Sequence, residues 1–224
     1  MSLIRLEAAT QAAELALFDT RAVPALNAPD EATLDALAAE GRLLRLPSGA
    51  NGSYLLHLYT ETSVPPEVLQ YCDDADSLTG DFRCESGHIG FGGVESAFQA
   101  FAADPVVRTD AAIAPGDYAY TAYHTEFPGK LLRAAVEAHL SAPERRLLKA
   151  PMQCIVVSAI AGVALAWLAH PLWLLEALLV GYGLSRWIRA RPAYVALGAR
   201  CRQARISFPS IVVALRAHVG DALP

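Results

Sequence analysis

Cys72, Cys84 and His88 carry side chains of the types that bind zinc. An acidic run, CDDADS, begins at the first of them. The spacing Cys-x11-Cys-x3-His matches no common zinc pattern, and no fourth ligand is evident. The run also lacks the Gly and Glu that a calcium-binding loop places at fixed offsets. We therefore predict no metal and no cofactor, and interpret the run as a solvated acidic loop.

His57, His88 and His124 are the other candidates for catalysis, since each lies on or beside a predicted strand. The chain has neither a GxSxG elbow nor an HExxH motif to supply a partner for them. The glycine-rich segment GHIGFGG lacks the strand-loop-helix unit that phosphate binding requires, and a tight hairpin explains its glycines. The cysteines form no CxxC pair and are predicted to be free thiols. We predict that the protein is not an enzyme.

Two apolar segments near the C-terminus are long enough to cross a membrane. Residues 152–169 contain no charged residue, and residues 172–188 contain only Glu176 and Arg186. As helices, the segments would each be about 25–27 Å long, close to the thickness of a bilayer's hydrocarbon core. A His-Pro pair separates them. The pattern predicts a transmembrane helical hairpin, although a buried hairpin in a soluble helical core would have a similar composition.

Small residues repeat every four positions in both segments, as close packing of membrane helices requires. In an antiparallel hairpin the two series run past each other in opposite directions. We expect Gly162 to face Gly181, with the other members paired outward from them. The predicted packing residues are Ser158, Gly162, Ala166, Ala177, Gly181 and Ser185.

Basic residues stand at both ends of the hairpin. By the positive-inside rule, both termini are cytoplasmic and the turn, flanked by Trp167 and Trp173, points outward. The N-terminus lacks the apolar core of a secretory signal, so the preceding part is expected in the cytoplasm. We predict residence in a bacterial inner membrane. The flanking basic residues are Arg145, Arg146, Lys149, Arg186, Arg189, Arg191, Arg200, Arg202 and Arg205.

Charge divides the chain into two parts that the formal net charge of −5 conceals. Residues 1–140 hold 8 basic and 20 acidic residues, and residues 141–224 hold 10 basic and 3 acidic residues. The basic part suits an anionic membrane leaflet. The acidic part excludes nucleic acid as its partner and favours a basic protein, although acidity also serves ordinary solubility.

The predicted fold class is α+β. Residues 1–140 are expected to form an acidic, β-rich soluble domain, either a sandwich or barrel-like, with a helix over 30–40 and a long strand over 117–127. Turn signals at Asn51-Gly52 and Ser86-Gly87 predict two β-hairpins. The membrane hairpin would occupy residues 141–191, with Pro151 marking a break. Residues 192–224 would form a short helical tail, although residues 206–220 also suit a strand.

This layout resembles bacterial immunity proteins that neutralise contact-delivered toxins, such as those of type VI secretion. The resemblance rests on GRLLRLPSGANGSYLLHLY, the strand DYAYTAYHTEF, the basic-flanked hairpin and a tail containing FPSIVV. It covers most of the chain as an architecture and transfers no functional residue. It implies a membrane-anchored protein that blocks a toxin by direct binding.

Three classes of function remain open: a binding protein, a membrane-associated enzyme or ligand sensor, and an effector whose hairpins oligomerise. We favour a binding protein, with a basic toxin as the expected partner. The densest acidic patch lies after Tyr71, where two aromatic residues could anchor an interface. A solvated loop is the alternative. The predicted partner-binding residues are Tyr71, Asp73, Asp74, Asp76, Asp81, Phe82 and Glu85.

Overall fold

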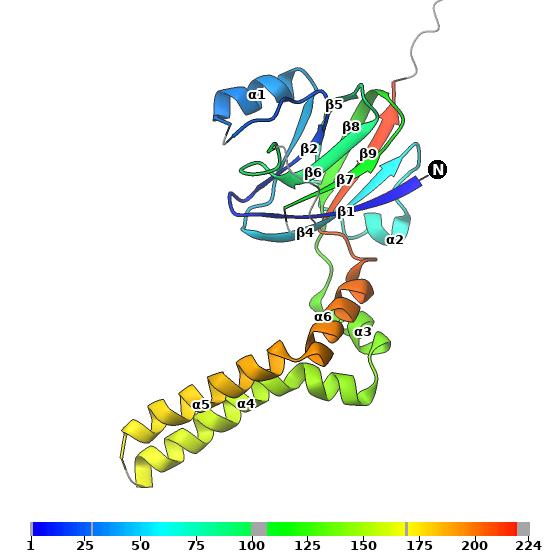
Figure 1. Ribbon diagram of the computed structural model, residues 1–224. Coiled ribbons are helices and arrows are strands. Elements are labelled where there is room, and N and C mark those ends of the chain that lie inside the picture. Colours follow the sequence, from blue (N-terminus) through cyan, green and yellow to red (C-terminus); the bar gives the residue numbers. More distant parts are fainter. Residues whose placement is uncertain (1, 28, 100–106, 169, 219–224) are drawn as a thin grey trace, which may run out of the picture. The chain divides into compact units, whose positions relative to one another are not determined.

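The computed structural model describes residues 2–27, 29–99, 107–168 and 170–218, and the chain forms two compact units (Figure 1). A β-rich unit combines Met1–Phe127 with Phe208–Pro224, and a helical unit spans Pro128–Ser207. The helical unit is therefore inserted into the β-rich unit. The predicted boundaries at residues 140 and 191 differ from this division, because the last segment of the chain returns to the β-rich unit.

Two sheets form the β-rich unit. A five-stranded sheet has the order β1-β4-β9-β8-β5, and a four-stranded sheet has the order β3-β2-β6-β7. All strand pairs are antiparallel except β4–β9. The strands of the larger sheet are β1 Ser2–Thr10, β4 Gly52–Thr60, β9 Ile211–Ala217, β8 Gly116–His124 and β5 Leu78–Cys84. Those of the smaller sheet are β3 Leu43–Pro47, β2 Glu14–Asp19, β6 His88–Gly93 and β7 Arg108–Ala112.

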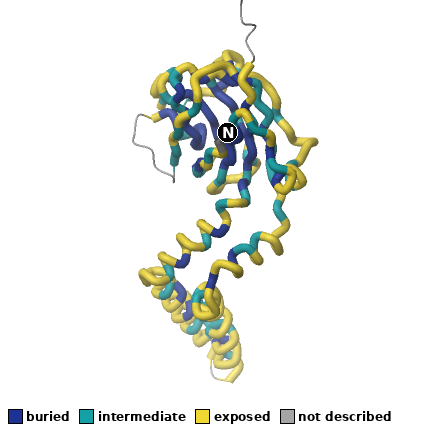
Figure 2. The backbone as a smooth tube through the Cα atoms, turned by 90° about the vertical axis from the view of Figure 1, so that its right-hand side faces the viewer, coloured by how far each residue is buried: buried dark blue, intermediate teal, exposed yellow. Residues whose placement is uncertain are grey.

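The two sheets pack face to face around one hydrophobic core (Figure 2). Alternate residues of each strand point inward, so that Leu17 of β2 and Phe91 of β6 join Leu58, Phe82 and Val213 of the larger sheet. These side chains are at most 1% exposed. The predicted α+β class is confirmed. The sandwich prediction is also correct, and the barrel-like alternative is not, because the sheets do not close on each other.

Local turn signals did not predict how the strands pair. The turn at Asn51-Gly52 joins β3 to β4, and the turn at Ser86-Gly87 joins β5 to β6. In both cases the two strands belong to different sheets. Both hairpin predictions were therefore wrong, since a turn reverses the chain without deciding which sheet receives the next strand.

Two short helices accompany the sandwich. Helix α1 (Glu31–Ala39) starts as predicted, because the carboxylate of Asp30 accepts a hydrogen bond from the Thr33 amide at 2.9 Å. Helix α2 (Pro66–Leu69) precedes the acidic loop, and its Val68 packs on the outer face of the larger sheet beside Tyr59.

The strand β9 corrects the predicted helical tail. Its residues Ile211, Val212, Val213 and Leu215 are each 0% exposed. It lies between β4 and β8, bonded to both. The run of β-branched residues suits a strand buried on both faces.

Four helices form the helical unit: α3 Gly129–His139, α4 Ala142–Leu168, α5 Leu172–Ala190 and α6 Pro192–Arg205. Helices α4 and α5 pack against each other as an antiparallel hairpin, and α3 packs on α6 through Val136 and Leu197. The expected break at Pro151 is absent, since α4 continues through this residue. Among the described helices, α4 alone is long and apolar enough to cross a membrane, judged by length and composition.

Candidate functional site

The acidic loop connects α2 to β5 and is exposed, as predicted for Asp73, Asp74 and Asp76. Its first carboxylate has a local structural task, since Asp73 accepts a hydrogen bond from the Ala75 amide at 2.9 Å. The Asp73 amide in turn donates to the carbonyl of His124 at 3.0 Å. The loop is thereby tied to the end of β8, while Asp74 and Asp76 project acidic side chains into solvent.

Tyr71 belongs to an aromatic cluster. Its ring centroid lies 4.6 Å from that of Phe127, which lies 5.2 Å from that of Phe208. Phe127 ends the first segment of the β-rich unit and Phe208 begins the second. Tyr71 is half-buried, so part of its surface packs against Phe127 and part stays accessible beside the acidic loop.

The other predicted residues are spread along β5. Asp76 precedes this strand and Glu85 follows it, and the strand between them is roughly 23 Å long at about 3.3 Å per residue. Phe82 is 1% exposed and belongs to the sandwich core. Its proposed role as an interface anchor is therefore wrong, because strand alternation turns Phe82 inward and Asp81 outward.

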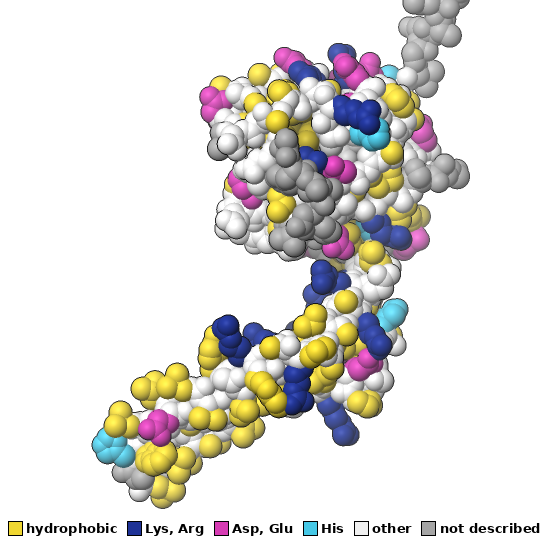
Figure 3. All heavy atoms as spheres, in the orientation of Figure 1, with side chains coloured by type: hydrophobic (Ala, Val, Ile, Leu, Met, Phe, Trp, Pro, Cys, Tyr) yellow, Lys and Arg dark blue, Asp and Glu magenta, His cyan; other side chains and the backbone are white. Residues whose placement is uncertain are grey.

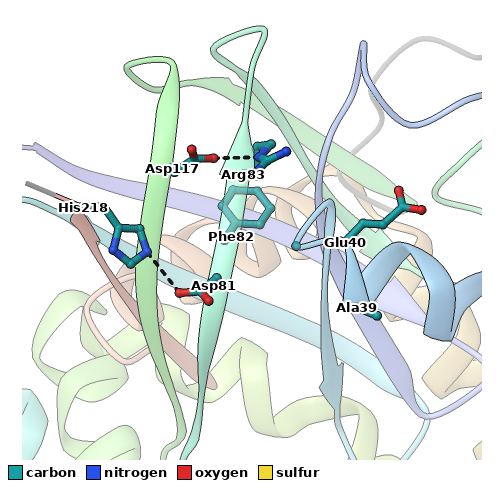
Figure 4. Close-up of a pocket in the computed structure, with 8 residues that line it drawn as sticks. Ala39, Glu40, Asp81, Phe82, Arg83, Asp117 and His218 are labelled. Carbon is teal, nitrogen blue, oxygen red and sulfur yellow. Dashed lines mark hydrogen bonds and ion pairs between the residues drawn. The ribbon is translucent and has the colours of Figure 1, made fainter. Parts of the chain in front are cut away.

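A cavity of about 310 Å³ opens beside the exposed face of β5. In it, Arg83 Nε donates to Asp117 Oδ1 at 2.8 Å, and His218 Nε2 lies 3.0 Å from Asp81 Oδ1 (Figure 4). The bond to Asp117 raises the pKa of Arg83. The lining residues come from α1 and the residues after it, from β5 and β8, and from the residue that follows β9. The lining residues are Ala39, Glu40, Gly41, Asp81, Phe82, Arg83, Asp117 and His218.

This cavity offers charged groups and no nucleophile. Its described lining contains three carboxylates, one guanidinium and one imidazole, but no hydroxyl or thiol that the Asp81–His218 pair could activate. The arrangement is suited to binding polar or basic groups. The sequence indicated Asp81 but not Asp117 or His218. Strand pairing brings Asp117 opposite Arg83, and a side-chain contact brings His218 to Asp81 from a distant part of the chain.

A second cleft, of about 450 Å³, lies between β3 and β5 and also includes Asp81. Arg45 in its wall is ion-paired with Glu14 at 2.9 Å and with Glu31 at 2.8 Å, and it also contacts Asp35. These bonds outweigh burial and raise the pKa of Arg45, with the Glu14 bond contributing most. Three carboxylates around one guanidinium leave this edge of the sandwich acidic.

The cysteines and His88 do not form a joint site. The backbone of Cys72 forms an isolated antiparallel β-bridge with Thr125 before β5 begins, and Cys84 is the last residue of β5. Burial raises the pKa of both thiols to about 11, so they are protonated at neutral pH and are weak nucleophiles. Within the described part of the chain, no group of three or more His, Cys, Asp or Glu residues is placed to hold a metal ion.

Asp19 is a buried carboxylate that the sequence did not reveal. It is 0% exposed and accepts hydrogen bonds from the Ser86 amide at 2.8 Å, the Arg21 amide at 2.9 Å and the Ala22 amide at 3.0 Å. The Ser86 hydroxyl donates to it as well. Burial alone raises the pKa of Asp19, but these bonds outweigh burial and lower it. Asp19 therefore fastens the turn between β5 and β6.

The predicted packing residues of the hairpin lie between α4 and α5. Gly162, Gly181 and Ser185 are buried, while Ser158, Ala166 and Ala177 are half-buried. The pairing differs from the predicted one by one helical turn. A Cβ built on Gly181 would lie 2.6 Å from the Ser158 Cβ, and one built on Gly162 would lie 2.9 Å from the Ala177 Cβ.

The outer surface of the hairpin is apolar, as the yellow side chains in Figure 3 show. Trp167 is 91% exposed and Ile160 is 66% exposed, and only 11% of the most apolar window of α4 is buried. Charge follows the division into units more sharply than it follows the predicted boundaries. The β-rich unit has 7 basic and 20 acidic residues, and the helical unit has 11 basic and 3 acidic residues.

Comparison with known proteins places the chain in no family. No family model and no curated protein matches it. Two solved structures match with a TM-score of 0.37 each. One is described as "Crocagin biosynthetic gene J" and is 20% identical in sequence. The match covers 55% of this chain and 76% of that chain. The other is ComJ of Bacillus subtilis, an inhibitor of the DNA-degrading activity of NucA, and is 12% identical in sequence. The match covers 56% of this chain and 86% of the ComJ chain.

Proposed function

We propose that this chain is a membrane-anchored binding protein. In this proposal the hairpin is inserted into a bilayer, and the acidic sandwich binds a basic protein without catalysing a reaction. The observation that carries the proposal is the division of charge and apolar surface between the two units. The β-rich unit has a net charge of −13 and the helical unit one of +8. A basic toxin, neutralised at the inner membrane of a bacterium, is the partner class we favour.

The exposed apolar surface of the hairpin supports the proposed membrane anchor. Soluble proteins rarely expose a continuous apolar patch larger than a few hundred Å². The described surface of α4 and α5 exposes large apolar side chains from Met152 at one end of the hairpin to Trp167 at the other. A helix satisfies the carbonyl and amide groups of its interior within the segment, as a bilayer requires.

The insertion explains why the anchor is a hairpin. Strands β8 and β9 are hydrogen-bonded neighbours in one sheet, and the helical unit connects them. A chain that enters the membrane after Phe127 must therefore return to the same side before Phe208. Helix α5 supplies this return, although its apolar segment contains Glu176 and Arg186, whereas residues 152–168 of α4 contain no charged residue. The basic flanks support our proposal that this side is the cytoplasm, because basic flanks of membrane helices favour the cytoplasmic side.

Binding is supported by acidic surface at two places on the sandwich. The loop with Asp74 and Asp76 is one, and the cavity with Asp81 and Asp117 is the other. A net charge of this size steers a basic partner toward the protein and raises the association rate at low salt. Tyr71, half-buried at the edge of the loop, supplies an aromatic contact.

Capture of the partner should respond to charge in a graded way. Full-length protein in detergent micelles would be used to isolate partners from the host lysate, and association rates would be measured with the most basic partner recovered. The variants are Asp73→Asn with Asp74→Asn and Asp76→Asn, and Asp73→Asn with Asp74→Lys and Asp76→Lys. Asparagine at position 73 keeps the oxygen that accepts the Ala75 amide.

We expect the association rate at low salt to fall by about threefold or more with each step, and the dissociation rate to change little. A parallel pair, Asp81→Asn with Asp117→Asn, tests the cavity as the other acidic surface. If neither set of substitutions changes the association rate at any salt concentration, the binding proposal is rejected.

Anchoring is tested separately. Carbonate washing at high pH should leave the full-length protein in the membrane fraction.

A further inference from the structure

The hairpin changes from basic to apolar within one turn on each of its helices. On α4, Lys149 is followed by Met152, which is 65% exposed. On α5, Trp187 is 56% exposed and is followed by Arg191, whose guanidinium carbon lies 3.6 Å from the indole ring centroid. A tryptophan stacked with an arginine combines an apolar ring with a charged tip, which is the chemistry of a membrane interface.

The observed packing register brings these two transitions to the same level. Because Gly181 lies against Ser158 and Gly162 against Ala177, antiparallel geometry places Met152 opposite Trp187. The register predicted from sequence would have offset the two transitions by a helical turn. The tertiary structure thus defines one boundary that runs across both helices.

Basic residues gather at this boundary and on one side of it. All eleven Lys and Arg residues of the helical unit fall in residues 130–149 or 186–205, and Glu176 is the only charged residue between these ranges. The two remaining acidic residues are Glu137 and Glu144, and Glu144 is ion-paired with Arg200. We define the basic collar as the basic residues of α4, of α5 and of the residue that follows α5 that lie nearest the boundary: Arg145, Arg146, Lys149, Arg186, Arg189 and Arg191. All six are exposed.

We infer that the basic collar binds the phosphate groups of an anionic phospholipid surface, with Lys149 and Arg191 at the level of the headgroups. The inference rests on the proposed membrane anchoring and adds the lipid class and the depth. From Met152 to Trp167 the apolar section is about 23 Å long. This is shorter than a hydrocarbon core of about 30 Å, and long basic side chains at the boundary extend toward the phosphates to bridge the difference.

The decisive measurement is a choice between two membranes. Full-length protein diluted from detergent would be mixed with vesicles of phosphatidylcholine and with vesicles of phosphatidylcholine and phosphatidylglycerol at 7:3, and the two populations separated by flotation. The test variant is Lys149→Gln with Arg186→Gln and Arg189→Gln, none of which alters the Arg191–Trp187 contact. The control removes the same charge from exposed positions of the β-rich unit: Arg5→Gln, Arg21→Gln and Arg216→Gln.

We expect the native protein and the control to prefer the anionic vesicles by about tenfold or more at low salt, and less at high salt. The collar variant should lose this preference and still resist carbonate extraction. Equal partitioning of the native protein between the two membranes would overturn the inference while leaving the anchor intact. Release of the native protein by carbonate would instead reject the anchor. A control that loses its preference would show a general charge effect and would also overturn the inference.

Depth supplies a second readout that does not depend on lipid charge. With Trp167→Phe and Trp173→Phe, the remaining tryptophan is Trp187. Its fluorescence should be quenched most strongly by lipids brominated near the headgroup. Stronger quenching by lipids brominated near the chain ends would contradict the assigned level.

Discussion

Gly181 of α5 lies directly against Ser158 of α4, since a Cβ placed on the glycine would come within 2.6 Å of the serine Cβ. We predict that Gly181→Leu separates the helices and lowers the stability of the hairpin by roughly 1–3 kcal/mol. Gly183→Leu is the matched control, because a Cβ at this position meets nothing within 4 Å. Thermal unfolding followed by circular dichroism in detergent micelles measures both. Equal midpoints for the two variants would show that this contact does not hold the hairpin.

Strand β9 makes the first 140 residues incomplete as a domain. A fragment ending at residue 140 lacks a strand that is hydrogen-bonded on both sides and contributes Ile211, Val213 and Leu215 to the core. We predict that this fragment aggregates, contrary to the expectation from sequence. Replacing residues 128–207 by a short Gly/Ser linker should restore a soluble sandwich, because the Phe127 and Phe208 rings are 5.2 Å apart. Sedimentation and strand content by circular dichroism distinguish the two, and a soluble, folded fragment would contradict the prediction.

Asp19 should make the stability of the sandwich sensitive to acid. Its pKa is below the ordinary 3.8 in the folded protein, so its contribution is fully present above this value and is lost as pH falls through the folded pKa. Asp19→Asn should cost roughly 1–3 kcal/mol at pH 7, since the amide accepts fewer of the four hydrogen bonds. Urea unfolding between pH 2 and pH 7 should show less loss of stability on the acid side for the variant. Asp74→Asn, in the exposed loop, should leave the curve unchanged.

The thiols of Cys72 and Cys84 should react slowly. Burial raises the pKa of each to about 11, which leaves little thiolate at pH 7. With Cys154→Ser and Cys201→Ser in place, we predict slow labelling of the folded protein by a disulfide reagent and rapid labelling in urea. On the binding proposal, Cys72→Ala leaves partner capture unchanged, whereas a loss of capture would require a role for this thiol.

The sequence predicted features that depend on local chemistry. Asp30 before an amphipathic run predicted the start of α1, and the alternation of residues 117–127 predicted most of β8. The spacing of Gly162 and Gly181 indicated the faces on which the two long helices meet. The uncharged run before His170 indicated a long apolar helix, and α4 is such a helix.

Tertiary structure decided whatever depends on partners distant in the chain. The turn at Ser86-Gly87 reverses the chain, but only packing places β5 and β6 in different sheets. From the sequence alone, Phe82 suited either an interface or the core. The alternation of inward and outward side chains along β5 places it in the core. Residues 211–217 became a strand because β4 and β8 leave a gap between them that these residues fill. The helix register is likewise set by the closest fit of Gly181 to Ser158, since periodicity alone leaves a slip of one turn undetermined.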